Sequence, residues 1–316
     1  MYRLGIDLGG TNIATGVVDE NFKIIGSGKV KTNAPRPAEE IVDDMVKSAL
    51  MAVKDANLTI GDIDSIGVGT PGSVVQTTGV VTYSNNLGFY NLPLAEMLEK
   101  KLGKKVYIEN DANAATYGEY IAGAGKGTEN FVAITLGTGV GGGIIIGGKI
   151  YSGSNFAGGE LGHTVIQMNG EACTCGRNGC FEAYASATAL IRQTKQAMIK
   201  FPESKMWEIC NKDINNVSGR TAFDGARSGD EAAIGVVNDY INYLSVGIAN
   251  IINTFQPDVF CVGGGISNEG EYLMAPIRKL VKGENYARNM EKNTEIKAAT
   301  LGNDAGIIGA AYLGEI

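Results

Sequence analysis

The sequence predicts an α/β fold made of two lobes. Strand-like segments alternate with helical segments along the chain, which is the pattern of an α/β protein. A strand–glycine turn–strand pattern near the N-terminus returns near the middle of the chain, and this diverged internal repeat predicts two similar lobes. At 316 residues and 33.1 kDa the chain also exceeds the size at which one hydrophobic core stops growing. We therefore expect a cleft between the lobes.

The first half of the chain begins with a β-meander. Residues 2–31 read as strand, glycine turn, strand, turn and strand, with the glycine turn at Asp7 to Asn12. The segments that we expect to follow are a helix over 38–57, a strand over 65–69, a loop at Asn85 and Asn86, a helix over 94–102, a strand over 105–109 and a helix that opens at Asn110 or Asp111.

The second half repeats the opening pattern. Residues 133–146 align with residues 5–18 when Leu136-Gly137 is set on Leu8-Gly9, and both read as strand, glycine turn and strand. The segments that we expect next are a cysteine-bearing loop over 170–180, helices over about 182–201 and 230–255, a strand over 258–262 that runs into Gly263 to Gly265, and a final helix capped at Asn303-Asp304.

Composition excludes several classes of protein. The net charge of -7 and the pI near 5.0 provide no basic face for nucleic acid. No signal leader is present, and no apolar run approaches the roughly 18 residues of a membrane span, so we expect a soluble, cytoplasmic protein. Five cysteines are too few for a disulfide scaffold in a chain of this length, but three of them form a cluster.

The first glycine turn has two interpretations. In the segment Asp7-Leu8-Gly9-Gly10-Thr11-Asn12, glycines let backbone N–H groups approach an anion, and the Asp7 carboxylate could face a hydrated cation. Together these features describe a phosphate site. An ordinary hairpin, in which Asp7 and Asn12 only stabilise the turn, is an equal alternative when this segment is taken alone.

The second glycine turn, at residues 137–143, imitates two nucleotide motifs without matching either. A dinucleotide fingerprint opens a helix, whereas Ile144-Ile145-Ile146 is strand-like. A P-loop needs Ser or Thr where this chain has Ile150. Two glycine hairpins at matching positions of a duplicated fold are nevertheless much harder to explain as coincidence than either alone.

Four soft metal ligands lie within eighteen residues: His163, Cys173, Cys175 and Cys180. This set suits tetrahedral Zn²⁺ in a closed structural site. Three buried thiols or a chance cluster are the alternatives, but the stretch Cys-Thr-Cys-Gly-Arg-Asn-Gly-Cys is too polar and too rich in turn residues for a core. A catalytic zinc is not expected, because no open coordination position is evident.

Three carboxylates stand near these motifs. Asp111 follows a predicted strand and starts a helix, where an acid could simply cap the helix. Glu160 and Glu182 flank the cysteine cluster, and each could be a solvated surface residue or, for Glu182, an acid in the first turn of a helix. Charge alone does not choose between these interpretations.

Taken together, these residues resemble the ROK family of bacterial sugar kinases and repressors, within the wider group that includes Hsp70 and actin. The glucokinase branch is the most similar. The resemblance covers nearly the whole chain, through the segments DLGGTN, TPG, SNN, ENDANAA, ITLGTGVGGG, GGELGH, CTCGRNGCFEAYAS, VGGGIS and GNDAGIIGAA. It implies a two-lobed actin-like ATPase fold of duplicated ribonuclease H-like domains, with a small lobe at 1–112 and 302–316 and a large lobe at 113–301.

The resemblance also implies roles for particular residues. The first phosphate loop would comprise Asp7, which faces magnesium, with Gly9, Gly10, Thr11 and Asn12; the second would comprise Thr138 and Gly139, and the adenosine segment Gly264 and Gly265. The sugar would be lined by Asn86, Asn110, Asp111, Glu160, His163 and Glu182. Structural zinc would be bound by His163, Cys173, Cys175 and Cys180.

The implied reaction is transfer of the γ-phosphoryl group of ATP to the 6-hydroxyl of glucose, with Mg²⁺ as cofactor and Asp111 as general base. The same pocket could instead accept N-acetylmannosamine, N-acetylglucosamine, fructose or mannose. A sugar-sensing repressor is a lesser alternative, because the family's repressors carry a helix-turn-helix ahead of the first glycine turn, which here begins at Asp7. The family further implies a homodimer or homotetramer.

Overall fold

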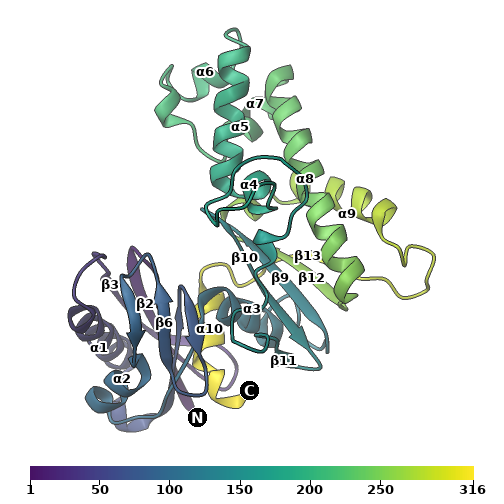
Figure 1. Cartoon of the computed structure of the whole chain (residues 1–316). Coiled ribbons are helices and arrows are strands. Elements are labelled where there is room, and N and C mark those ends of the chain that lie inside the picture. The colour runs from purple at the N-terminus through teal and green to yellow at the C-terminus, as the bar shows by residue number, and fades with distance from the viewer. The chain divides into compact units, whose positions relative to one another are not determined.

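The computed structural model describes all 316 residues, Met1–Ile316. The chain divides into two compact units: the first comprises Met1–Val132, Gly143–Gly159 and Thr300–Ile316, and the second comprises Ala133–Gly142 and Glu160–Ala299. The first unit therefore contains both ends of the chain (Figure 1). None of the helices combines the length and the apolar composition that crossing a bilayer requires. The predicted lobe borders, 1–112 with 302–316 and 113–301, stay a prediction.

A five-stranded sheet with the order β3-β2-β1-β4-β8 forms the centre of the first unit. Its strands are β1 (Tyr2–Leu8), β2 (Asn12–Val18), β3 (Ile24–Lys31), β4 (Ile63–Thr70) and β8 (Val106–Asn110). β2 is antiparallel to β1 and β3, whereas β4 is parallel to β1 and β8. The register sets Asp7 opposite Gly69 and Thr70 opposite Asn110, so the carboxyl ends of the parallel strands meet at one edge.

Helices cover both faces of this sheet. Figure 1 shows α1 (Ala38–Asp55) and α2 (Leu94–Leu102) on one side, and α3 (Asp111–Ala122) and α10 (Asp304–Ala311) on the other. The core beneath α1 and α2 contains fully buried apolar side chains from helices and strands alike, among them Leu4, Ile6, Ile41, Met45 and Leu98. The predicted β-meander and the helices at 38–57 and 94–102 are confirmed.

Glu119 of α3 connects this helix to the C-terminal segment of the same unit. Its buried carboxylate accepts hydrogen bonds from the backbone N–H groups of Thr300 at 2.9 Å, Leu301 at 2.7 Å and Ala124 at 2.9 Å. A buried carboxylate is tolerated when hydrogen bonds satisfy it, as they do here. Glu119 therefore fixes the chain just before α10 begins.

A second five-stranded sheet has the order β11-β10-β9-β12-β13. Its strands are β9 (Phe131–Leu136), β10 (Val140–Ile146), β11 (Lys149–Ile150), β12 (Val259–Gly263) and β13 (Glu295–Ala298). Counted along the chain within each sheet, both have the order third, second, first, fourth, fifth. The shared order confirms the internal repeat that the two glycine turns predicted.

A small antiparallel sheet follows β4 and was not predicted. It consists of β5 (Ser73–Val75), β6 (Val80–Ser84) and β7 (Phe89–Leu92). The predicted loop at Asn85 and Asn86 is the turn between β6 and β7. The sheet therefore brings Asn86 to the tip of a hairpin.

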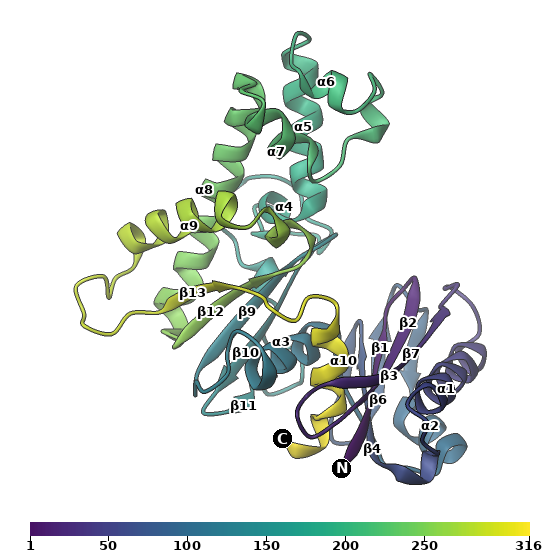
Figure 2. The ribbon, with the colours of Figure 1, turned by 180° about the vertical axis from the view of Figure 1, so that it is seen from behind.

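Six α-helices belong to the second unit (Figure 2). They are α4 (Glu182–Ala185), α5 (Ala187–Lys200), α6 (Met206–Ile209), α7 (Thr221–Arg227), α8 (Glu231–Phe255) and α9 (Glu271–Glu284). The helix predicted over 182–201 is wrong in one respect, because Ser186 interrupts it. Ser186 has extended backbone angles, and its hydroxyl accepts a hydrogen bond from the N–H of Ala189 at 3.1 Å, which caps α5.

Two further details differ from prediction. The apolar stripe of α8 is buried as expected except at Ile234, which is 38% exposed. The final helix begins at Asp304 as expected, but the predicted cap is wrong. Asn303 has helical backbone angles, φ -71° and ψ -13°, and no side chain caps the helix there.

Candidate functional site

Two carboxylates lie at the edge of the first sheet where its parallel strands end. Burial raises the pKa of Asp7 from 3.8 to about 6, and repulsion from the Asp111 carboxylate adds to that rise. The pKa of Asp111 is also raised, chiefly by burial. Buried acids that repel one another bind a proton or a cation more readily than solvated acids do, and such shifts are concentrated at functional sites.

Asp111 does not cap its helix, which was the simpler interpretation of the sequence. Asn110 is the N-cap of α3, and its side-chain oxygen accepts hydrogen bonds from the N–H groups of Ala112 at 2.9 Å and Asn113 at 3.2 Å. The amide nitrogen of Asn110 donates to the backbone oxygen of Gly72 at 3.1 Å. Asn110 therefore holds the start of α3, and Asp111 is the first residue inside it.

Glu109 is a residue that the sequence analysis missed. Its carboxylate accepts hydrogen bonds from the Asn113 side chain at 3.1 Å, from the N–H of Asn110 at 2.8 Å and from Gln76. Burial raises the pKa of Glu109, and these three donors oppose the rise. The signal in the sequence was an acid that directly follows the apolar end of a strand. Glu109 positions the junction that presents Asp111.

Hydrogen bonds to its backbone carbonyl oxygens hold the first glycine turn in place. The N–H of Gly9 donates to the oxygen of Asn12 at 2.9 Å, and the N–H of Thr32 donates to the oxygen of Thr11 at 3.0 Å. The hydroxyl of Thr32 donates to the oxygen of Gly9 at 2.6 Å. Gly10 and Thr11 are exposed at the tip. This rigid, exposed turn suits binding of an anion through backbone N–H groups.

Asn86 lies beside the same turn. A Cβ placed on Gly10 would lie 3.8 Å from the Cβ of Asn86, so the hairpin that carries Asn86 reaches the tip of the glycine turn. The first unit thus contains Asp7, Gly9, Gly10, Thr11, Asn12, Asn86, Asn110 and Asp111. The remaining predicted site residues belong to the second unit.

The second glycine turn lies against the triple-glycine segment that follows β12. Gly264 has a φ of 87°, and a Cβ on it would come within 2.5 Å of the backbone of Leu136, so only glycine fits there. The turn itself is held by a hydrogen bond from the N–H of Gly137 to the oxygen of Gly139 at 3.0 Å. The hydroxyl of Thr188 donates to the oxygen of Thr138 at 2.8 Å. The second unit therefore brings the two predicted nucleotide segments together.

Glu182 connects the second glycine turn to the cysteine-bearing loop. One carboxylate oxygen accepts a hydrogen bond from the N–H of Val140 at 2.9 Å. The other accepts from the hydroxyl of Thr174 at 3.3 Å and lies 3.9 Å from the sulfur of Cys173. Glu182 is the first residue of α4, so the interpretation as an acid in the first turn of a helix is confirmed, and its hydrogen bonds show that it is not a solvated surface acid.

The predicted zinc ligands form a cluster. The ligand atoms of His163, Cys173, Cys175 and Cys180 all lie within 4.8 Å of one another. The Sγ atoms of Cys175 and Cys180 are 3.6 Å apart, and Nδ1 of His163 is 3.6 Å from the Sγ of Cys173. Ligands about 2.3 Å from a tetrahedral zinc are separated by nearly this distance. The donor set and its spacing fit structural zinc.

Glu160 precedes this cluster. It stands before a short 3₁₀ turn, Leu161–His163, and its backbone oxygen accepts a hydrogen bond from the N–H of His163 at 3.0 Å. Its side chain is exposed. The turn therefore fixes Glu160 and His163 relative to one another within the second unit.

The resemblance seen in the sequence is confirmed by comparison with known proteins. The ROK family model matches residues 3–315. Glucokinase from Thermotoga maritima is 37% identical over 311 residues, which covers 98% of this chain and 96% of that protein. The crystal structure of a ROK family glucokinase from Streptomyces griseus in complex with glucose and AMPPNP has a TM-score of 0.84 and 37% identity, with 99% of each chain covered. The ROK hexokinase from Thermus thermophilus has a TM-score of 0.83 and 32% identity, and covers 99% of this chain and 97% of its own. This chain belongs to the ROK family, and its fold is the actin-like fold of the sugar kinases in that family.

Proposed function

We propose that this protein is an ATP-dependent glucokinase in which Asp111 is the general base. The reaction transfers the γ-phosphoryl group of ATP to the 6-hydroxyl of glucose. The observation that carries this proposal is the pair of partly buried carboxylates with raised pKa values, Asp7 and Asp111, at the carboxyl edge of the first sheet. Relatives support the proposal, because glucokinases match this chain over nearly its whole length.

The environment of Asp111 suits a general base. A sugar hydroxyl is a weak nucleophile, so a carboxylate must accept its proton as the new bond forms. Burial raises the pKa of Asp111 and makes its carboxylate a stronger proton acceptor than a solvated aspartate. Asn110 is the cap of α3, and the Oδ1 of Asp111 also accepts a hydrogen bond from the N–H of Ala112 at 2.9 Å, so the helix does not depend on the Asp111 carboxylate alone.

The two glycine turns suit a nucleoside triphosphate. We assign Asp7, Gly9, Gly10, Thr11 and Asn12 to the first phosphate loop, Thr138 and Gly139 to the second, and Gly264 and Gly265 to the adenosine. Mg²⁺ bound with ATP would neutralise charge on the phosphates, and the partly buried Asp7 offers the oxygen ligand that this cation prefers. The backbone N–H groups of both turns would stabilise the negative charge that develops during transfer.

In this proposal, residues from several segments bind the sugar. We assign Asn86, Asn110, Asp111, Glu160, His163 and Glu182 to hydrogen bonds with the ring hydroxyls. In His163 the Nδ1 atom faces the thiol cluster, which leaves Nε2 for the sugar. The zinc site would hold His163 and the loop that contacts Glu182, so the metal contributes to recognition without taking part in the reaction.

The proposed chemical step transfers a phosphoryl group from one oxygen to another. The 6-hydroxyl oxygen of glucose attacks the γ-phosphorus, and its proton passes to the carboxylate of Asp111. The bond from the γ-phosphorus to the bridging oxygen breaks, and ADP leaves with the electron pair. The products are glucose 6-phosphate and ADP, and the proton on Asp111 returns to solvent.

A coupled assay for ADP release tests the proposal. ATP and Mg²⁺ are supplied with glucose, mannose, fructose, N-acetylglucosamine or N-acetylmannosamine in turn, and we expect a strong preference for glucose. Preference for an N-acetyl sugar would overturn the choice of substrate and keep the reaction. Absence of turnover with every sugar would favour a sugar-binding regulator.

The Asp111→Asn variant tests the base directly. We expect turnover to fall by ~10² or more while the Kd for glucose changes little, because Asn keeps the shape of the side chain and cannot accept the proton. The measurement is the single-turnover rate at saturating substrates, together with glucose binding by calorimetry. Near-normal turnover would refute the assignment of Asp111.

Location and assembly belong to the same proposal. ATP as donor favours the cytoplasm, and the net charge of -7 disfavours nucleic acid as a partner. Family membership favours a homodimer or homotetramer, which light scattering measures directly.

A further inference from the structure

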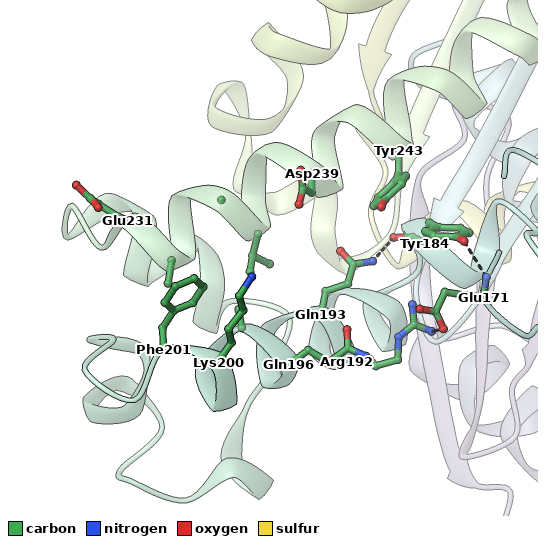
Figure 3. Close-up of a pocket in the computed structure, with 14 residues that line it drawn as sticks. Glu171, Tyr184, Arg192, Gln193, Gln196, Lys200, Phe201, Glu231, Asp239 and Tyr243 are labelled. Atoms are coloured by element: carbon green, nitrogen blue, oxygen red, sulfur yellow. Dashed lines mark hydrogen bonds and ion pairs between the residues drawn. The ribbon is translucent and has the colours of Figure 1, made fainter.

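A cavity of about 590 Å³ lies between α5 and α8 of the second unit. Figure 3 shows its polar side chains facing one another from the two helices, with Gln193 and Lys200 on one wall and Asp239 and Tyr243 on the other. Small-molecule sites in proteins have volumes of about 300–1,000 Å³. None of the residues assigned above to ATP, sugar or zinc lines this cavity.

Two buried polar atoms at the cavity lack partners. The Nε of Arg192 and the Oε1 of Gln193 make no hydrogen bond in the structure. The orientation of the Gln193 amide is fixed, because its nitrogen donates to the backbone oxygen of Tyr184 at 2.9 Å and that oxygen can only accept. One donor and one acceptor, on consecutive residues of α5, are therefore left unsatisfied. Buried polar atoms without partners are rare in native proteins and need an explanation.

Gly235 of α8 is the second independent observation. It lies inside a 25-residue helix and lines the cavity, and a Cβ placed on it would meet no atom within 4 Å. Glycine is a poor residue for a helix interior, so its use here is unfavourable unless the space is needed. Nothing in the chain fills that space, whereas a ligand in the cavity would.

The charges of the residues that line the cavity indicate which class of ligand it can bind. Charged groups of both signs line the cavity: Arg192, Lys200, Glu171, Glu231 and Asp239. The excess of one negative charge disfavours an anion such as a phosphate ester. An apolar ligand would leave the amides and charges unpaired, which is unfavourable.

The cavity also offers aromatic surfaces next to its polar groups. The rings of Tyr184 and Tyr243 lie 4.6 Å apart at one end, and Phe201 lies at the other. Aromatic rings favour the apolar face of a ligand, while each hydroxyl of a ligand can both donate and accept a hydrogen bond. The hydroxyls of a ligand could therefore pair with the charged groups and amides that line the cavity while its apolar face lies against the rings.

We propose that the cavity between α5 and α8 binds a neutral saccharide, as a site separate from the one assigned to the phosphorylated sugar. The cavity lies next to the zinc loop, because the N–H of Glu171 donates to the hydroxyl of Tyr184 at 2.7 Å, and both residues line it. Tyr184 is in α4, the helix that Glu182 begins. A saccharide held there contacts the segment that positions Glu182. The proposal does not depend on which hexose the enzyme phosphorylates.

Two matched variants test this site. Gly235→Leu places a side chain in the cavity, and Gly283→Leu makes the same substitution in α9, where a Cβ also meets no atom within 4 Å and no cavity residue lies. Both replace a helical glycine, so both are expected to fold. The active site is first saturated with glucose and a non-hydrolysable ATP analogue. Maltose and further glucose are then titrated, followed by calorimetry and by the fluorescence of Trp207.

Trp207 is a suitable reporter because it is the only tryptophan in the chain. Its indole N–H donates to the backbone oxygen of Met198 at 3.1 Å, close to the end of α5 that lines the cavity. We expect one additional equivalent of maltose or glucose to bind to the wild type and to Gly283→Leu. Gly235→Leu is expected to weaken that binding at least tenfold while turnover with ATP and glucose, measured without maltose, stays unchanged.

Three results would overturn the proposal. One is the absence of additional binding of either sugar to the wild type. Another is equal binding by Gly235→Leu and the wild type. The third is a change in the mass of Gly235→Leu by light scattering, which would mean that a second copy of the chain, rather than a saccharide, covers this face.

Discussion

Replacing Asp7 by asparagine should stabilise the protein while it removes activity. Burial and the nearby Asp111 raise the pKa of Asp7 from 3.8 to about 6. Each pKa unit corresponds to about 1.4 kcal/mol, so ionised Asp7 destabilises the folded protein by about 3 kcal/mol above neutral pH. Asparagine has nearly the same shape and carries no charge. We therefore expect Asp7→Asn to raise the free energy of unfolding by up to about 3 kcal/mol, or roughly 5 °C in Tm for a chain of this length.

The pH dependence of this gain identifies its cause. Below pH 3.8 the carboxyl is protonated in both the folded and the unfolded chain, so its charge costs nothing. As pH rises through the interval from 3.8 to about 6, the unfolded chain ionises first and the folded protein loses stability. The advantage of Asp7→Asn should therefore be full at pH 8 and should shrink to under about 1 kcal/mol at pH 4.

Scanning calorimetry without Mg²⁺ or nucleotide, at both pH values, measures this gain. Glu96→Gln, which removes an exposed carboxylate of α2, serves as the control and should change Tm little at either pH. No gain for Asp7→Asn at pH 8, or a gain of the same size at pH 4, would refute the reasoning. Addition of Mg²⁺ and an ATP analogue should stabilise the wild type more than the variant, because the cation relieves the repulsion between the two acids.

Two further changes test the zinc loop and the residue attached to it. Chelation of zinc, or Cys175→Ala, should remove the metal and abolish glucose phosphorylation while Asp111 stays in place. Metal analysis measures the loss of zinc, and the ADP assay measures the loss of activity. Full activity in metal-free protein would contradict the prediction. Glu182→Gln should keep the zinc and raise the KM for glucose about tenfold, the equivalent of about 1.4 kcal/mol and typical of a hydrogen bond to a charged group. Varying glucose and ATP separately checks this, and a rise confined to the KM for ATP would assign Glu182 to the nucleotide instead.

Much of the fold could be predicted because local signals agreed with the final structure. Apolar residues at helical spacing located α1 and α2 to within two residues, and the two glycine turns predicted the repeated sheet. The break at Ser186 could not be predicted. Its neighbours favour helix, and only the hydrogen bond from Ala189 to the serine hydroxyl shows that a new helix starts there. The small sheet β5–β7 was missed because its strands are only three to five residues long.

Part of the candidate site could also be predicted from the sequence, and part could not. Spacing alone was enough to group the zinc ligands, since all four lie in one short segment. Asn110 is the helix cap and Asp111 is the adjacent, partly buried acid. This distinction depends on the direction of two neighbouring side chains, which a sequence does not contain. Glu109 was missed because its partner Gln76 is 33 residues away in the chain.

Glu182 connects the zinc site to the second glycine turn, and this link could not be inferred from the sequence. Its two oxygens bind different segments, the N–H of Val140 on one side and the hydroxyl of Thr174 on the other. A Cβ on Gly139 would lie 2.2 Å from an oxygen of the same carboxylate, so any larger residue there would displace Glu182 from its hydrogen bonds. A shift of the zinc loop would therefore also move the Glu182 carboxylate, which fixes a proposed phosphate loop. This gives a physical reason for a structural metal in a kinase whose chemistry does not require zinc.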